Sequence, residues 1–565
     1  MTENRGRDGG FRGAGKGQSR PAKPRADRPA QRWKRDDQAR GNRPPFRGKK
    51  TEEAAGESTG GKRTFSPRGG APGTGGNKMH RAPVQPREKR DGRPGEEKRM
   101  HAHGRPDRRP GRGKPERPIN LAPRRVALET LLDVSRSDAY ASLALDKRLA
   151  QADLPRRDRA FVTQLVYGTL ENRLTLDWRI DQFLDGEKDL EPTVREILRM
   201  GAYQLFYLDR VPDMAAVDES VRLTRAMGFE ALTGLVNAVL RSMIRGKNET
   251  VWPKPQEDAA RYLSVMFSAP QELCSMLMEA YGEQGALEIL RYRPAKRDVT
   301  VRINYLRCDD ARLRSLFADE EIAFDPGMVP GTYKVHDAGD LTRMRAFQNG
   351  LFTIQGESSV IAARVVGAAP GQTVLDACAA PGGKTAVLSE MMHDTGRVYA
   401  WDTHAHRVDL IKGTMNRLKL ENVRPAVRDA AVPREEMAMT LDAALVDAPC
   451  SGTGVMMEKP DVKYRVSREG VQALCCTQAK ILDAVAPMVK VGGTLVYATC
   501  SILPQENEDQ VRAFLARHPE YEIAPMAALL PEALAGREGE YGLQMFAHRD
   551  GTDGFYVCRM RRVRG

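Results

Sequence analysis

Residues 373–385 read TVLDACAAPGGKT, a short apolar run followed by a turn of small residues. Such a run before a glycine-rich turn predicts a buried strand, and the pattern of residues 386–392 predicts that a helix follows it. The Gly383-Lys384-Thr385 sequence is also the end of a P-loop, but Cys378 stands where a P-loop needs its first glycine. The GxGxxG spacing of dinucleotide-binding folds does not match either. The stretch therefore predicts a strand, a turn that lets the backbone approach a ligand, and a helix N-terminus.

Strands and helices alternate through the rest of the C-terminal part. We expect further strands at residues 396–402, up to about 429, at 442–447 and at 494–499, with helices at 407–418 and 477–489. This alternation predicts a doubly wound parallel sheet of the α/β, Rossmann-like class, whose ligand site lies at the carboxyl ends of the strands. Asp376, Asp402, Asp429 and Asp447 all stand at or near such ends.

The expected crevice suits S-adenosylmethionine. A helix N-terminus attracts a carboxylate, and the methionine part of this cofactor carries one. Asp402 follows Asp376 by 26 residues and ends the next strand, where it can accept hydrogen bonds from the ribose hydroxyls as in a dinucleotide site. A helix N-cap is the alternative role for Asp402, and it is compatible with binding.

Two cysteines each follow an apolar run. Cys450 lies in DAPCSGTG at residues 447–454, and Cys500 lies in YATCS at residues 497–501. Because both runs are expected strands, both thiols should emerge at the same crevice. A lone cysteine is usually an inert buried residue, but two at strand ends favour a nucleophile. Cys475 and Cys476 have no such context, and we interpret this adjacent pair as helix packing.

Residues 1–117 differ sharply in composition from the rest of the chain. They hold 33 Lys and Arg against 14 Asp and Glu, a net charge of +19, whereas the remainder holds 56 against 61, a net charge of −5. One Val and no Leu or Ile cannot bury enough apolar surface to offset the entropy of ordering, so we expect a disordered basic tail. Its arginines and scattered aromatic residues suit RNA, and a solubilising extension is the alternative.

Three further segments follow the tail. Residues 118–250 carry apolar residues at helical spacing, at 125–149, 161–170, 195–208 and 217–244, and predict an all-helical domain. Residues 251–350 have a helix at about 271–291, a strand at 299–304 and a helix at 310–317, which predicts a small α+β module. Residues 351–565 hold the alternating pattern described above.

Several classes of protein are excluded by what the sequence lacks. No stretch approaches 18 apolar residues and the N-terminus has no hydrophobic signal core, so neither a membrane span nor secretion is predicted. The eight cysteines include no CxxC pair, which argues against a zinc site or a disulfide framework. We expect a cytoplasmic protein with reduced thiols and no metal.

Several motifs together resemble the RsmB/NSUN family of RNA cytosine-5 methyltransferases. They are residues 376–385, 447–454 and 499–501, PQENE at 504–508 and DGF at 553–555. Residues 157–162, 166–170 and 236–241 are similar to the NusB-like RNA-binding helical domain, and the whole resemblance covers roughly residues 118–562. It implies that S-adenosylmethionine is held by ten residues: Cys378, Ala379, Ala380, Pro381, Gly382, Gly383, Lys384, Asp402, Asp429 and Asp447.

The resemblance also implies a division of labour between the thiols. In the RNA family the Thr-Cys cysteine attacks and the Pro-Cys cysteine assists product release, which implies Cys500 as nucleophile and Cys450 as release residue. DNA cytosine methyltransferases use the Pro-Cys cysteine instead, which here is Cys450. A thiolate is needed because carbon 5 of cytosine attacks a methyl sulfonium only after a thiolate has added to carbon 6. Asp447 is our candidate for stabilising the charge that develops near N3 of the base.

The expected partner is RNA. The resemblance implies small-subunit (16S) rRNA, unassembled or partly folded, because the target base must leave its stack. Transfer RNA is the alternative substrate, and a non-catalytic RNA-binding ribosome assembly factor is the alternative class. We expect a monomer with no membrane partner. Lys459 and Lys463 follow the Cys450 loop, and are expected either to hold RNA phosphate or to be solvated.

Overall fold

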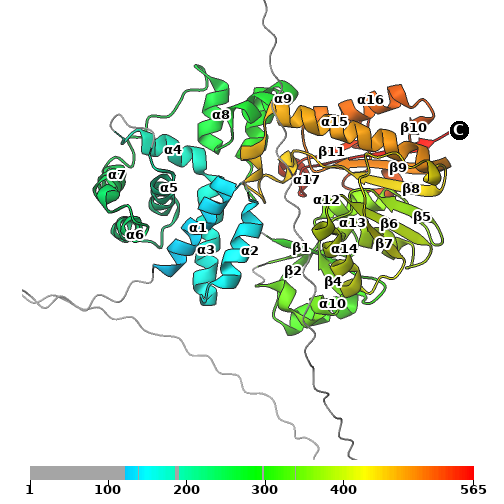
Figure 1. Ribbon diagram of the computed structural model, residues 1–565, viewed down its shortest axis with the longest axis horizontal. Coiled ribbons are helices and arrows are strands. Elements are labelled where there is room, and N and C mark those ends of the chain that lie inside the picture. The colour runs from blue at the N-terminus through cyan, green and yellow to red at the C-terminus, as the bar shows by residue number, and fades with distance from the viewer. Residues whose placement is uncertain (1–120, 138, 185–189, 295–297, 337–338) are drawn as a thin grey trace, which may run out of the picture. The chain divides into compact units, whose positions relative to one another are not determined.

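The computed structural model describes residues 121–137, 139–184, 190–294, 298–336 and 339–565. The expectations for the basic tail, residues 1–117, lie outside these ranges. Figure 1 shows a group of helices, a small sheet and a larger sheet with helices on both faces. In the described ranges, no helix has the length and apolar character needed to cross a membrane.

The N-terminal part is all helical, as predicted. Its helices are α1 (Ala122–Ser137), α2 (Ala141–Gln151), α3 (Arg156–Glu171), α4 (Arg173–Asp181), α5 (Pro192–Tyr207), α6 (Asp213–Ala226) and α7 (Thr233–Arg245). They share one core, in which Leu128, Leu165 and Ile197 are fully buried. The patterns at 125–149 and 217–244 each contain two helices, and Gly228 turns the chain after α6 with a φ of +89°.

The middle part contains two structures. Helices α8 (Ala259–Phe267) and α9 (Gln271–Arg291) pack with buried residues that include Met456, Val471 and Ile502 of the C-terminal part. The other is an antiparallel sheet in the order β2-β3-β1-β4, with α10 (Asp310–Asp319) and α11 (Arg345–Gln348). Its strands are β1 (Val299–Ile303), β2 (Phe324–Pro326), β3 (Thr332–Val335) and β4 (Phe352–Ile354). The expected boundary at residue 350 is therefore too early, because β4 pairs with β1 and a three-residue strand gives almost no periodic signal.

Two arginines join the small sheet and its helices to the C-terminal part. Arg302 of β1, almost fully buried, pairs with the carboxylate of Glu390 through two hydrogen bonds. Arg417 donates to the carbonyl oxygens of Phe347 and Phe352, at 3.0 Å each. A guanidinium presents several donors in a fixed plane, so each arginine ties the small module to a helix of the C-terminal part at two points.

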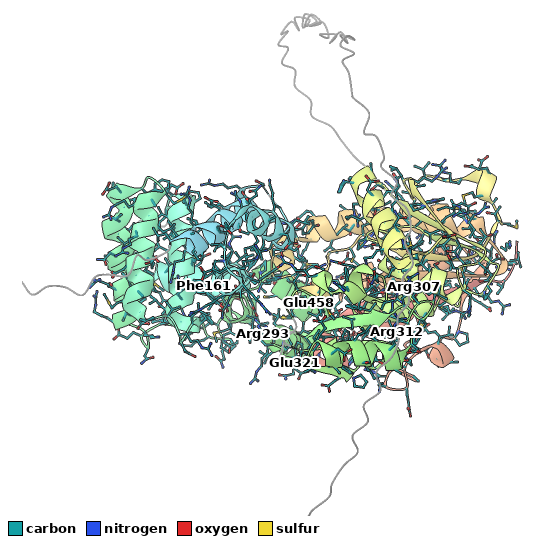
Figure 2. All side chains as sticks on the ribbon, turned by 90° about the horizontal axis from the view of Figure 1, so that it is seen from below. Phe161, Arg293, Arg307, Arg312, Glu321 and Glu458 are labelled. Atoms are coloured by element: carbon teal, nitrogen blue, oxygen red, sulfur yellow. The ribbon has the colours of Figure 1, made fainter. Side chains whose placement is uncertain are left out.

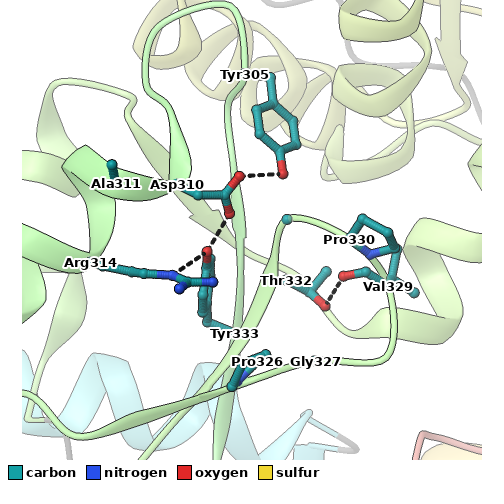
Figure 3. A pocket seen from close by; sticks show the side chains of 11 residues that line it. Tyr305, Asp310, Ala311, Arg314, Pro326, Gly327, Val329, Pro330, Thr332 and Tyr333 are labelled. Carbon is teal, nitrogen blue, oxygen red and sulfur yellow. Dashed lines mark hydrogen bonds between the residues drawn. The ribbon is translucent and has the colours of Figure 1, made fainter.

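A cavity of about 510 Å³ lies beside the small sheet (Figure 3). Inside it the Asp310 carboxylate accepts hydrogen bonds from the hydroxyls of Tyr305, at 2.9 Å, and Tyr333. Arg314 donates to the Tyr333 hydroxyl at 3.2 Å. The polar groups thus bond to one another, and no residue of the predicted site lines this cavity.

The C-terminal part is the predicted doubly wound sheet. Its strands are β5 (Thr373–Asp376), β6 (Arg397–Asp402), β7 (Val423–Val427), β8 (Leu441–Asp447), β9 (Val489–Thr499), β10 (Tyr521–Ile523), β11 (Leu543–Met545) and β12 (Phe555–Arg562). The order is β10-β12-β9-β8-β5-β6-β7, and β11 pairs with β12. Strands β5 to β9 are parallel, whereas β12 runs antiparallel to β9.

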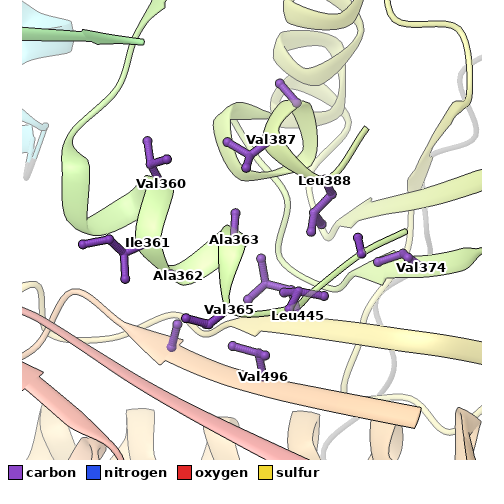
Figure 4. Close-up of a cluster of buried hydrophobic side chains, with 14 of the residues drawn as sticks. Val360, Ile361, Ala362, Ala363, Val365, Val374, Val387, Leu388, Leu445 and Val496 are labelled. Carbon is purple, nitrogen blue, oxygen red and sulfur yellow. The ribbon is translucent and has the colours of Figure 1, made fainter. Parts of the chain in front are cut away.

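Helices cover both faces of this sheet. One face carries α12 (Glu357–Arg364), α13 (Gly383–Met391) and α14 (Ala405–Leu418), and the other carries α15 (Arg468–Val485) and α16 (Glu508–Arg517), while a short α17 (Ala547–Asp550) precedes β12 (Figure 1). Helix α15 begins well before the expected residue 477, because the Ser467 side chain caps it by accepting from the Gly470 N–H. Figure 4 shows the packing on the first face, where Val374, Leu388 and Val496 are fully buried. Burial on both faces explains the continuous apolar runs of the strands.

Candidate active site

The turn after β5 is fixed to both neighbouring strands. The N–H of Ala377 donates to the carbonyl of Leu445 in β8 at 2.9 Å, and that of Ala379 donates to Trp401 in β6 at 2.8 Å. Gly382 has a φ of +105°, in the region that favours glycine, and a Cβ there would lie 3.4 Å from the backbone of Ile411. Helix α13 starts at the next residue. The predicted strand, turn and helix N-terminus are thus confirmed, and the positive end of the helix dipole faces the turn.

Acidic side chains surround this turn at the predicted strand ends. Asp376 is fully buried, and the Thr385 hydroxyl donates to its Oδ2 at 2.7 Å. Its Oδ1 has no hydrogen-bond partner among the described residues, and burial raises the pKa of this carboxyl to about 7. Asp402 is also buried and pairs with Arg407 at 3.1 Å. Asp429 is exposed, just beyond the end of β7.

Lys384 links the turn to the end of β8. Its ammonium donates to Oδ2 of Asp447 at 2.7 Å and lies 5.2 Å from the centre of the Phe555 ring. Burial opposes the charged form of Lys384, but the Asp447 carboxylate outweighs it and holds the lysine pKa above its ordinary value. A fixed positive charge therefore stands at the carboxyl end of β8.

The two predicted cysteines meet next to the carboxyl ends of β8 and β9. Their Sγ atoms lie 3.3 Å apart, both residues are partly exposed, and both thiols are free. The hydrogen bond from Cys450 lowers the pKa of Cys500, burial and Asp447 oppose that shift, and the ammonium groups of Lys384 and Lys459 add to it. The surroundings of Cys500 therefore favour its ionised, thiolate form.

Cys450 has the opposite surroundings. Donating its hydrogen bond to Cys500 raises the pKa of Cys450 well above its ordinary value, and burial and the carboxylate of Glu506 shift the pKa in the same direction. The pair thus consists of one thiol favoured as thiolate and one favoured as a proton donor. The local sequence around the two cysteines does not reveal this asymmetry.

Glu506 joins the two cysteine loops, and we assigned it no role from the sequence. Its carboxylate is fully buried and accepts from the N–H and hydroxyl of Ser451, at 2.8 and 2.5 Å. It also accepts from the Ser501 hydroxyl at 2.5 Å and from the Gln478 amide at 3.1 Å. One carboxylate thus holds the residues that follow each cysteine. Its place in the PQENE motif was the only signal in the sequence.

Close backbone packing joins the loops around the two thiols. The N–H of Gly454 donates to the carbonyl of Cys500 at 2.9 Å, and the N–H of Gly554 donates to Gly454 at 3.0 Å. A Cβ on Gly454 would lie 1.9 Å from the Gly554 oxygen, so no larger residue fits. The three motifs around residues 450, 500 and 554 therefore form one unit.

Two expectations for this region are wrong. Lys463 is 3% exposed and donates to the carbonyl of Glu171 in α3 at 2.8 Å, so it is neither solvated nor open to RNA phosphate. A local pattern could not show this, because the partner belongs to the helical domain. Cys475 is buried as expected for packing, but Cys476 on the same helix is exposed. Among the described residues, no three His, Cys, Asp or Glu side chains form a group that could hold a metal ion.

The sheet order, the glycine turn after the first parallel strand and the acidic strand ends are those of class I methyltransferases. A family model described as 16S rRNA methyltransferase RsmB/F matches residues 363–561, and the NusB family model matches residues 121–245. The chain belongs to the RsmB/F family of 16S rRNA methyltransferases, with a NusB domain in front of the catalytic part.

Similar proteins cover most of the chain. The probable ribosomal RNA small subunit methyltransferase B of Bacillus subtilis (strain 168) is 37% identical over 441 residues, which are 78% of this chain and 98% of that protein. Ribosomal RNA small subunit methyltransferase B of Thermus thermophilus is 34% identical over 441 residues, with the same two shares. The crystal structure of PH0851 is similar in fold, with a TM-score of 0.68 and 24% identity, over 78% of this chain and 99% of that one.

Proposed function

We propose that this protein transfers a methyl group from S-adenosylmethionine to carbon 5 of a cytosine in 16S rRNA, through a covalent bond between Cys500 and carbon 6 of the base. The observation that carries the proposal is the pair of free thiols 3.3 Å apart, next to the carboxyl ends of β8 and β9. Methylation of an oxygen or nitrogen needs no thiol, whereas carbon 5 of a pyrimidine requires prior addition at carbon 6. Membership of the RsmB/F family supports small-subunit rRNA as the substrate.

The residues around the β5 turn fit the proposed cofactor. Oδ1 of Asp376 is buried and has no hydrogen-bond partner in the part of the chain that the structure describes, so it offers an acceptor. The glycine turn and the N-terminus of α13 offer a positive end for the carboxylate of an amino acid group. Asp402 would accept from the ribose hydroxyls, and Asp429, Asp447 and residues 378–384 complete the set. When bound, the cofactor supplies an electrophilic methyl group on a sulfonium.

In this proposal the side chains of the crevice handle the base and its charge. The Cys500 thiolate adds to carbon 6, which makes carbon 5 nucleophilic, and Asp447 stabilises the charge that develops at N3. After carbon 5 has gained the methyl group and lost its proton, the bond between carbon 6 and sulfur breaks. Cys450 assists that last step, because its S–H donates to the departing Cys500 thiolate.

The rate of methyl transfer should depend on pH through Cys500. The thiolate is the reactive form, so below the Cys500 pKa the single-turnover rate should fall about tenfold per pH unit. Because that pKa is lowered, the rate should level off at a pH below the value of about 8.5 at which a free thiol is half ionised. Single-turnover rates at saturating cofactor, measured between about pH 5.5 and 9, check this expectation. A rate that still rises through pH 9 would contradict the assignment of Cys500 as the more acidic thiol.

The proposed substrate is rRNA that has not yet been assembled, bound by a monomer in the cytoplasm. The test is transfer of labelled methyl from the cofactor to three RNAs: free 16S rRNA, assembled small subunits and transfer RNA. We expect 5-methylcytosine in the free 16S rRNA alone, and the Cys500→Ala variant as a matched control should give none. If only the transfer RNA is methylated, transfer RNA takes the place of 16S rRNA as the substrate. If none of the three RNAs is methylated, the alternative stands that the protein is a ribosome assembly factor without catalytic activity.

A further inference from the structure

The segment after the Cys450 loop, residues 461–465, contacts the helical domain through four polar side chains. Oδ2 of Asp461 accepts from the N–H of Ala141, at the start of α2, at 3.1 Å. The hydroxyl of Tyr464 donates to the carbonyl of Leu170 near the end of α3 at 2.7 Å. Two more contacts complete what we call the junction: Lys463 Nζ to the Glu171 carbonyl at 2.8 Å, and Arg465 Nη2 to the Ala139 carbonyl at 2.7 Å.

The junction buries two charged side chains. Asp461 is 4% exposed and Lys463 is 3% exposed, and a charge out of water is costly unless its partners are in place. Burial, followed by the nearby Arg293, lowers the pKa of Lys463 to about 7, while Glu171 and Cys274 oppose that shift. Since each of these two side chains bonds to the backbone of the helical domain, the segment depends on that domain for its conformation.

Arg293 adds a second link at the same place. Its guanidinium pairs with Glu171 of α3 at 3.0 Å and contacts the sulfur of Met457 at 3.4 Å. Figure 2 labels Arg293 and Glu458, the residue after Met457, in the region where the helical domain meets the catalytic part. Arg293, which follows α9 of the middle part, therefore links the helical domain to the chain before the junction.

The other end of the same segment lies at the thiols. Gly454 is bonded to the Cys500 carbonyl, and the chain then turns tightly, with the Lys459 N–H donating to Val455 and the Val462 N–H donating to Lys459. Lys459 thus stands on a short turn between two fixed points, the crevice and the junction. Its charge acts on Cys500 together with the groups already described, Cys450, Asp447 and Lys384.

We propose that the helical domain, through the junction, positions the Cys450 loop and the turn that carries Lys459, which makes Lys463 a positioning residue. The helical domain is then part of the catalytic apparatus as well as a domain expected to bind RNA. The inference rests on the role of Cys500 in the proposed function.

The test is the reactivity of Cys500 in the full chain, without RNA. Iodoacetamide alkylation at Cys500 is followed against pH by mass spectrometry of the peptide, which separates it from Cys450. Lys463→Met should raise the apparent pKa of Cys500, and each unit of that rise lowers the alkylation rate at pH 7 about tenfold. Lys459→Met should also raise the apparent pKa of Cys500. The alkylation rate of the double variant should be no lower than that of Lys459→Met, because both changes act through the charge of Lys459. Lys490 is partly exposed and pairs with Asp442 at the other end of β9, so Lys490→Met is the matched control and should react like the wild type.

Tyr464→Phe is a milder second variant, which keeps the test possible if Lys463→Met does not fold. It removes the hydroxyl that bonds to Leu170 and leaves the buried charges in place, so the pKa should shift in the same direction by less. Thermal unfolding and cofactor binding report whether each variant is folded. The proposal would be overturned if the folded Lys463→Met and Tyr464→Phe proteins were alkylated at Cys500 at the wild-type rate. Alkylation of the Lys459→Met protein at the wild-type rate would overturn it as well. Alkylation needs no methyl transfer, so a failure of the proposed function would show separately in the labelled-methyl assay.

Discussion

Replacing Cys500 with alanine should lower methyl transfer by at least about 10⁴-fold, the scale seen when a covalent nucleophile is removed. Cys450→Ala should have a different result: the addition proceeds, but the departing thiolate loses its hydrogen-bond donor and the protein accumulates bound to RNA. Denaturing gels with labelled RNA measure the adduct, and labelled cofactor measures the transfer.

The exposed Cys476 provides a matched control for both variants. Cys476→Ala removes a thiol outside the crevice, so it should methylate like the wild type and trap no RNA. A trapped adduct in the Cys500→Ala protein, with none in Cys450→Ala, would reverse the roles of the two thiols. That result would place this chain with the enzymes that attack through a Pro-Cys cysteine.

Lys384→Met should lower the single-turnover rate about 10²- to 10³-fold, the usual cost of removing one electrostatic stabilising group from an active site. Methionine keeps the length of the side chain but leaves the Asp447 carboxylate without its 2.7 Å partner and removes one of the two cations that lower the pKa of Cys500. The rate should therefore fall even at saturating cofactor, and its pH profile should move to higher pH. Calorimetry measures the accompanying loss of cofactor affinity.

A double-mutant cycle separates the two roles of this lysine. If Lys384 acts mainly through its ion pair, Asp447→Asn should lose about as much alone as together with Lys384→Met. The coupling energy should then equal the whole effect of Lys384→Met, about 3 to 4 kcal/mol. Full additivity would show that Lys384 acts on the thiol or the cofactor independently of Asp447. A wild-type rate in Lys384→Met would contradict a catalytic role for the charge.

The arrangement of the site was predictable where it follows from strand ends. Asp376, Asp402 and Cys500 lie at or directly after the ends of β5, β6 and β9, as their apolar runs indicated. Parallel strands place their carboxyl ends along one edge, so residues separated by more than one hundred positions in the sequence meet there. The order of the strands, with β8 between β9 and β5, then brings Cys450 to Cys500.

The parts that could not be predicted depend on partners far away in the sequence. Glu506 bonds to Ser451, 55 residues earlier, and Lys463 bonds to Glu171, 292 residues earlier. A buried carboxylate or lysine has the same local sequence as a solvated one, because only the folded partner satisfies its charge. For the same reason, charge spacing alone placed Lys463 at the surface.

The central claim is that Cys500 bonds to carbon 6 of the target cytosine, and 5-fluorocytidine tests it most directly. In 16S rRNA that carries this base, carbon 5 has no proton to lose, so the wild-type protein should remain bound after the methyl group has been transferred. Digestion with protease and nuclease, followed by mass spectrometry, identifies the modified cysteine and the methylated, fluorinated base. We predict the nucleotide on Cys500. A nucleotide on Cys450, or no adduct while unsubstituted rRNA is methylated, would contradict the account.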